Sequence, residues 1–324
     1  MFVVLALALC ATSARAHGIA GNRFFVGTVT FDDPAVADEA IAPAVSTLPR
    51  AVEGSDALEG RINWSFVRFR INWSFVRLLT PTIAVSIDQG WIHRSFSAGA
   101  LSGFDTTNIG IKGEIFRDNR HETLISAGFA WGIGQSGARS IGASGPNTLQ
   151  PGLFFGKGLG DLPNSLSWLR PFAVTGAIVD ELPLSSVGGT LAPDPSTGRF
   201  AAFPAITPET LHWGFTVQYS TYYLTSRFTG GEPRDEPLNQ LVPLVEFNFD
   251  SPRDQKTAVA INPGFAYVAV TWQIAAEAIV PLNREAGSGP GFRAQLLFFL
   301  DDLIPSVFGK PLLTDQPNRS LIKW

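Results

Sequence analysis

Residues 213–220 read WGFTVQYS, with apolar and small or polar side chains in strict alternation. Trp213, Phe215, Val217 and Tyr219 fall on one side of this pattern. Because successive side chains of a strand point to opposite faces, the alternation predicts a β-strand with one apolar, aromatic face.

The same alternation recurs along most of the chain. It is clear at residues 83–88, 108–115, 125–132, 149–156, 245–249, 272–278 and 292–299, and weaker at 168–180 and 256–267. A segment starting at residue 61 and the segment 22–31 (NRFFVGTVTF) bring the predicted total to about twelve strands. The chain is therefore predicted to be all-β.

The second face of these strands decides which kind of β protein to expect. In a water-soluble sheet this face is usually rich in charged residues and Thr, whereas here it carries mostly Gly, Ala, Ser, Asn and Gln. Charged residues make up 16% of the 324 residues, against a usual ~25%. We predict an antiparallel transmembrane β-barrel of about twelve strands, of the outer-membrane type, with apolar residues toward lipid and polar ones toward a lumen. A soluble, exported β-sandwich that acts as a binding module is the alternative fold.

The N-terminus predicts export. Residues 2–10 (FVVLALALC) are apolar, and Ala14-Arg15-Ala16 fits a signal-peptidase site before His17. We therefore divide the chain into a signal peptide (1–16), an exported N-terminal segment (17–60) and a barrel with a C-terminal tail (61–324). The acidic residues of the segment 17–60 predict a solvated loop outside the barrel.

Composition limits the partners. The net charge of −4 and the lack of a basic patch argue against nucleic acid. No other stretch is apolar for long enough to form a membrane-spanning helix. We expect outer-membrane lipid and a small-molecule solute as partners and no cofactor, and we leave the oligomeric state open.

One repeat needs a separate explanation. RINWSFVR occurs at residues 61–68 and again at 70–77. The odd spacing of nine would put Trp64 and Trp73 on opposite faces of one strand unless a bulge intervenes. We interpret it as a tandem duplication that lengthens one strand or its rim and has no function of its own.

The presumed lumen face supplies the candidate pathway residues. Isolated charges inside a barrel must pair or stay hydrated, so Lys112 and Arg293 are expected to face Glu114, Glu246 or Glu277. In an open lumen these side chains would set selectivity, and in a packed one they would form a structural network. The complete set is Asp88, Lys112, Glu114, Arg170, Gln218, Glu246, Asn248, Gln273, Glu277, Arg293 and Gln295.

Four segments together resemble a known family. They are residues 17–39 (HGIAGNRFFVGTVTFDDPAVADE), 153–163 (LFFGKGLGDLP), 169–176 (LRPFAVTG) and 295–302 (QLLFFLDD). They resemble a family of uncharacterised proteobacterial outer-membrane β-barrel proteins, loosely similar to transporters associated with phenol-degradation pathways. This resemblance implies an outer-membrane location and transport of small organic molecules; it assigns no site residues. For the barrel as a whole we expect a passive pore or transporter for small solutes.

Two other chemistries are weighed beside the channel. His93 and Ser95 lie two residues apart on a predicted strand, so they could act as base and nucleophile of an outer-membrane lipid hydrolase. They resemble the His-x-Ser pair of outer-membrane phospholipases and lipid A deacylases, although Asn-Gly does not follow. A mature N-terminus at His17 could hold copper, as in lytic polysaccharide monooxygenases. An enzymatic role is the less favoured interpretation.

Overall fold

The computed structural model describes residues 18–49, 65–96, 99–143, 145–185, 187–193, 200–221, 223 and 240–313. Within these residues, no helix is both long and apolar enough to cross a membrane.

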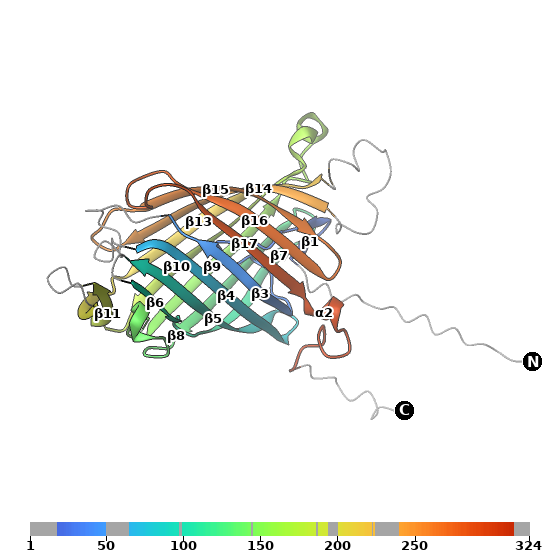
Figure 1. Ribbon diagram of the computed structural model, residues 1–324. Coiled ribbons are helices and arrows are strands. Elements are labelled where there is room, and N and C mark those ends of the chain that lie inside the picture. Colours follow the sequence, from blue (N-terminus) through green and yellow to red (C-terminus); the bar gives the residue numbers. More distant parts are fainter. Residues whose placement is uncertain are drawn as a thin grey trace, which may run out of the picture.

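Twelve antiparallel strands form a closed barrel (Figure 1). One sheet holds thirteen strands, and β6 (Gly99–Phe104) only extends the far end of β5, which leaves twelve in the ring. Pairing between β4 and β5 joins the two sides of the sheet. In ring order the strands are β3 (Glu39–Thr47), β4 (Ser65–Thr80), β5 (Ile83–Phe96), β7 (Asn108–Asp118), β8 (Thr123–Gly132), β9 (Thr148–Gly158), β10 (Phe172–Pro183), β13 (Thr210–Tyr219), β14 (Gln240–Pro252), β15 (Ala258–Val268), β16 (Trp272–Pro281) and β17 (Gly291–Phe299). The β-sandwich alternative is wrong, because the sheet closes on itself.

A few short elements lie outside this ring. They are the hairpins β1 (Ile19–Ala20) with β2 (Arg23–Phe24) and β11 (Val187–Pro193) with β12 (Phe200–Ile206), the 3-10 helices η1 (Arg139–Ile141) and η2 (Asn164–Leu169), and α2 (Leu300–Leu303).

The two faces of the wall follow the alternation in the sequence. Trp131, Phe265 and Phe292 are exposed on the outside, where Trp213 also stacks on Phe249 with 3.9 Å between ring centroids. The residues that alternate with these outward-facing ones point into the barrel, where Ser126 and Gln218, for example, are buried. The barrel exterior is thus apolar and aromatic, as in a lipid-facing surface.

Some of the connections distinguish the two ends of the barrel, although each end has both shorter and longer ones. The turns between β4 and β5 and between β7 and β8 are short, and α2 lies at the same end, at the right in Figure 1. The connections that contain β6, η1 and the β11–β12 hairpin are longer and lie at the opposite end. We call these the short-turn end and the long-loop end.

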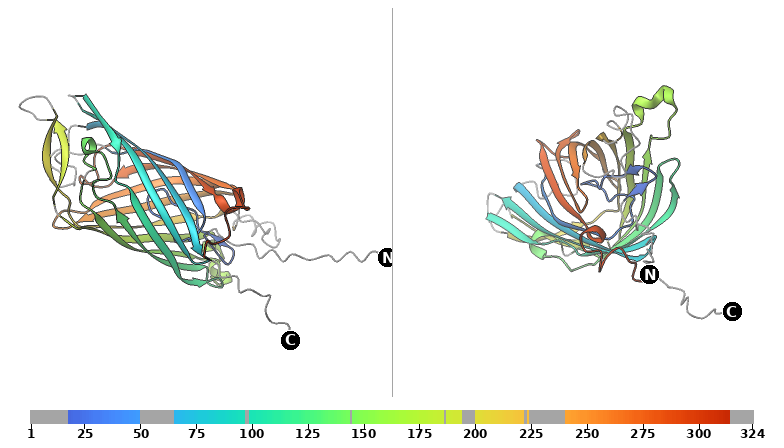
Figure 2. Two further views of the ribbon diagram at one scale, coloured as in Figure 1. Left: turned by 90° about the horizontal axis from the view of Figure 1, so that it is seen from below. Right: turned by 90° about the vertical axis from the view of Figure 1, so that its right-hand side faces the viewer.

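Residues 18–38 lie inside the barrel (Figure 2). This segment, here called the plug, enters at the short-turn end, reaches the middle of the lumen near Thr30 and returns to start β3. The prediction of a solvated loop outside the barrel is therefore wrong for these residues. The predicted strand 22–31 is also wrong, because only Arg23–Phe24 of it pairs, within the β1–β2 hairpin.

The missing barrel strand is β3, so the predicted boundary at residue 61 lies too far along the chain. β3 pairs with β4 and β17. The sequence did not predict β3 because this segment contains Pro43, and proline has no N–H to donate to the hydrogen bonds of a sheet. In the structure Pro43 lies where the register with β4 shifts, a place that tolerates proline.

The duplicated segment lengthens one strand, as predicted. Its second copy lies entirely in β4, which shows a register irregularity against β5 between Ser65 and Val67. Trp73 is on the outside, 37% exposed, and Trp64 lies outside the described residues.

Candidate functional site: the lumen and its plug

The wall holds the plug backbone through inward-pointing side chains. Gln218 both accepts from the N–H of Val26 and donates to its carbonyl, each at 3.2 Å. Gln273 donates to the carbonyl of Gly27 at 2.8 Å, and Gln295 donates to that of Thr28 at 3.2 Å. These amides replace the partner strand that the buried plug backbone lacks.

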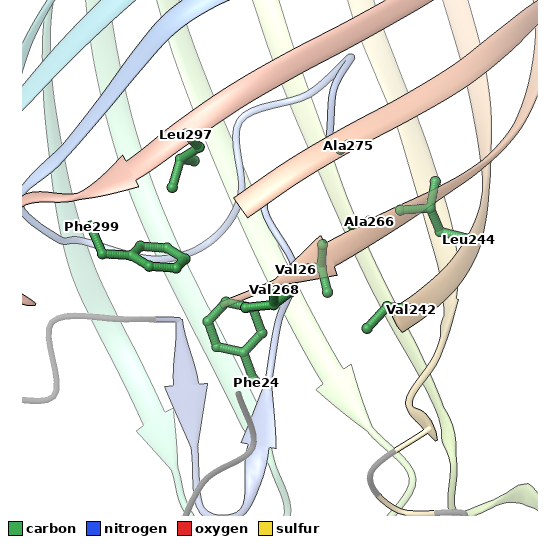
Figure 3. Close-up of a cluster of buried hydrophobic side chains, with 9 residues drawn as sticks. All are labelled: Phe24, Val26, Val242, Leu244, Ala266, Val268, Ala275, Leu297 and Phe299. Carbon is green, nitrogen blue, oxygen red and sulfur yellow. The ribbon is translucent and has the colours of Figure 1, made fainter. Parts of the chain in front are cut away.

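Apolar contacts fix both sides of the plug. Phe24 and Val26 pack against a cluster on the wall that includes Val268, Leu297 and Phe299 (Figure 3). Phe25 points the other way and is fully buried with Ala20, Leu124 and Ala173. Consecutive apolar residues therefore serve two opposite walls of the lumen, which explains why 22–31 did not alternate like a barrel strand.

Arg23 anchors the plug at the short-turn end. It is 1% exposed, and its Nε lies 3.2 Å from Oε2 of Glu122. Its Nη1 donates to the carbonyl of Pro171 at 3.1 Å, and its guanidinium lies over the ring of Tyr223 at 3.9 Å. A buried charge is tolerated here because it is both paired and hydrogen-bonded.

Lys112 holds the part of the plug that leads from Thr30 back to β3. Its Nζ donates to Oδ2 of Asp32 at 2.8 Å and to the carbonyl of Asp33 at 2.9 Å. The expectation that Lys112 faces Glu114, Glu246 or Glu277 is wrong, because the plug supplies the carboxylate of Asp32; Glu114 pairs with Arg117 instead. The expected pairing of Arg293 with Glu277 is present at 3.4 Å.

The plug meets the wall and the C-terminal segment at the short-turn end. Asp38 is fully buried and accepts from Nη1 of Arg77 at 2.6 Å, from the N–H of Leu78 at 2.7 Å and from the N–H of Gly309 at 2.7 Å. Val36 packs with Leu78 in a buried cluster beside it. This junction, here called the Asp38 knot, ties together plug, wall and tail.

At least two cavities remain in the lumen between the described residues. The larger, of about 550 Å³, runs beside the plug from Glu39 toward Arg70 and Asp105 near the long loops. The smaller, of about 320 Å³, lies between Thr30 at the plug tip and the wall near the long-loop end. Thr30, His212 and Asp250 line both cavities.

The structure places ten of the eleven predicted lumen residues on the wall strands. Six of them are at most 9% exposed: Gln218, Glu246, Asn248, Gln273, Glu277 and Gln295. Asp88 and Lys112 line the larger cavity. The prediction is wrong for Arg170, which is not on a wall strand. It follows η2, and its side chain donates to Leu162 and Asn164 of the same turn. A role of this set as a solute pathway stays a prediction.

Sequence reasoning missed the plug residues as part of the site. Arg23, Asp33 and Asp38 are each buried in the lumen. The one signal was the apolar run Phe24-Phe25-Val26 inside an otherwise acidic segment, since a solvated loop has no use for it.

The alternative sites gain no support. Nδ1 of His93 lies 2.7 Å from Oγ of Ser102 on β6, and the side chain of Ser95 lies outside the described part of the structure. His17 is also outside the described residues. Within the described ranges, no three His, Cys, Asp or Glu side chains gather as a metal site.

Comparison with known proteins adds little beyond the fold. No protein-family model matches the chain, and no curated protein matches it. Among solved structures, the chain is similar to an outer-membrane channel from Pseudomonas putida F1, with a TM-score of 0.47 and 10% identity. The match covers 81% of this chain and 94% of that one. The likeness to transporters of phenol-degradation pathways is tested by none of these comparisons and stays a prediction.

Asp33 makes docking of the plug depend on pH. Burial raises the pKa of this carboxyl from 3.8 to about 6, against the opposing charge of Lys112 and with the added negative charge of Asp32. Because the pKa is higher in the docked state, docking is strongest below about pH 4 and weakens as the pH rises through about 6.

We therefore expect the folded barrel to be less stable to heat at pH 7.5 than at pH 5. On a gel, the band of the folded form should disappear at a lower temperature at pH 7.5. Asp33→Asn keeps the oxygen that accepts from the N–H of Ala35 at 2.7 Å and should reduce this difference. An unreduced difference in that variant would contradict the assignment to Asp33; Glu39 and Lys112, which also face Asp33, would then need testing.

Proposed function

We propose that the protein is an outer-membrane channel through which small solutes, including organic ones, pass passively, and that the plug limits this passage. The larger cavity carries the proposal: it runs along the lumen between charged, polar and apolar side chains, inside a barrel whose exterior is apolar. Residues from 70 to 76 of β4 line it, which corresponds to roughly 20 Å of strand.

The number of strands supports a lumen wider than its wall residues can fill. Eight-stranded barrels are just filled by side chains, and barrels of sixteen or more strands leave an aqueous channel. Twelve strands lie between these cases. A wall of this size needs a further segment to close it, and the plug is that segment here.

The path is blocked at the short-turn end. Buried Val36, Leu78 and Ala84 lie there beside the Asp38 knot. Passage through the whole barrel therefore requires the plug to shift, which agrees with a plug held by individual side-chain hydrogen bonds and ion pairs instead of a continuous ladder.

The first test is whether the refolded protein conducts. In detergent it should migrate at a heat-modifiable position on a gel, and in a planar bilayer it should give small, intermittent steps of conductance. A chain that lacks the plug should conduct continuously. A folded, heat-modifiable protein that passes no ions with or without the plug would overturn the proposal, and a protein that stays soluble without detergent would overturn the membrane location.

A further inference from the structure

Four buried oxygen atoms face the lumen near the plug tip without a hydrogen-bond donor among the described residues. They belong to two carboxyl groups and two amides on three neighbouring strands: Oε2 of Glu246 and Oδ1 of Asn248 on β14, Oδ1 of Asn262 on β15, and Oε2 of Glu277 on β16. Each of the four residues is at most 9% exposed. We call this group the oxygen cluster.

Sheet register and hydrogen bonds bring the cluster together. Glu246 stands directly opposite Asn262 in the β14–β15 pair. Nδ2 of Asn262 donates to Oε1 of Glu277 at 3.3 Å, and the two carboxyl groups lie within hydrogen-bonding reach of each other. Asn248 lies two residues from Glu246 on the same face of β14.

The orientation of the Asn262 amide is settled by its partners. Its Nδ2 donates both to Oγ1 of Thr30, at 3.1 Å, and to Glu277. With an ionised Glu277 and with the Thr30 hydroxyl donating to Glu277, both partners accept, so the nitrogen points at them and Oδ1 points away. The four atoms of the cluster are consequently all acceptors, and the hydroxyl of Thr216, which stands opposite Glu246 on β13, is a further buried polar group without a partner among the described residues.

The charges around the oxygen cluster are a second consideration. Arg293 is the cation beside it, 3.4 Å from Oε1 of Glu277 and 2.5 Å from Oγ1 of Thr30. With both carboxyl groups ionised, two carboxylates and one guanidinium would leave one net negative charge in a buried place, which either a bound cation or a shared proton would compensate. One shared proton would satisfy the two Glu oxygens but would leave both Asn oxygens without a partner.

We propose that the oxygen cluster binds a hard metal cation such as Ca²⁺, which holds the plug tip to strands β14–β16. Carboxylate and amide oxygens are the ligands that Ca²⁺ accepts in flexible arrangements, with water completing its shell. The smaller cavity, which Asn248 and Asn262 line, provides space for that water and a route of entry. Oε1 of Glu246 accepts from the N–H of Val29 at 3.0 Å, so the same carboxylate also holds the plug. This inference does not depend on conduction through the barrel.

The test uses the full mature chain refolded in lipid-free detergent, with Ca²⁺ as the probe. Equilibrium dialysis should show one Ca²⁺ bound per chain, and Ca²⁺ should raise the temperature at which the heat-resistant gel mobility is lost. Glu277→Gln and Asn262→Leu should each weaken binding by about tenfold or more, since ligand number and charge set Ca²⁺ affinity.

Glu285→Gln is the matched control. Glu285 lines the same cavity but lies beside Lys256, at 3.9 Å, and is not part of the cluster. It should leave binding unchanged. The proposal is overturned if no Ca²⁺ binds at millimolar concentration, if Glu285→Gln weakens binding as much as Glu277→Gln does, or if acid alone stabilises the protein and Ca²⁺ adds nothing, which would indicate a shared proton.

Discussion

Removal of residues 18–38 is expected to raise the single-channel conductance roughly fivefold or more and to abolish intermittent closure. The plug fills the central lumen between opposite walls, and twelve strands enclose more space than their own side chains occupy. The chain starting at Glu39 keeps every barrel strand. Planar-bilayer recording of the refolded protein measures the effect.

A synthetic peptide of residues 18–38 provides the control. Added from the short-turn side, it should reduce the conductance of the shortened barrel, because Gln218, Gln273 and Gln295 remain available to it. If the deletion prevents folding, Gln218→Leu tests the same idea with a smaller change and should give longer openings. A folded barrel with unaltered conductance in both variants would show that the plug does not limit passage.

Asp38→Ala is expected to lower the free energy of unfolding by about 3–5 kcal/mol, which is the largest effect of any single substitution considered. The substitution removes the carboxylate partner of the half-buried Arg77, which keeps only the carbonyls of Val307 and Lys310 as acceptors among the described residues. It also leaves the N–H groups of Leu78 and Gly309 without their acceptor. Urea unfolding in lipid vesicles, followed by tryptophan fluorescence, measures the loss.

Asp161→Ala is the comparison for this variant. Asp161 pairs with Lys157 at 3.1 Å in a turn, where both side chains are partly exposed. Such a pair contributes about 0–1 kcal/mol. Equal losses in the two variants would mean that the Asp38 knot is no more than a surface ion pair.

Eleven of the twelve predicted strands correspond to barrel strands, because alternation is a local property. Each wall strand has lipid on one side and the lumen on the other, so its own sequence records the contrast, as in residues 213–220. The twelfth prediction, residues 22–31, was wrong for the same reason: this segment has lumen wall on both sides. β3 was not predicted because it contains Pro43 and small residues that alternate only weakly, a composition that resembles a loop.

The polar lumen face was predicted from the sequence, and its use was not. Glutamine at positions 218, 273 and 295 indicates that these side chains point inward. It does not distinguish an open pore from a packed barrel. Which of these holds depends on a segment more than 180 residues away in the chain, whose backbone the three amides hold. No local pattern carries that information.

The amino-acid sequence by itself determined the all-β class, the orientation of the two faces of each strand and the set of inward side chains, because all of these follow from a two-residue period. Only the tertiary structure decided that residues 18–38 occupy the lumen, that Asp38 joins plug, wall and tail, and that the four residues of the oxygen cluster lie on one stretch of wall near Thr30. These features arise from ring closure, which brings distant segments together inside one enclosed volume where buried polar groups must find partners.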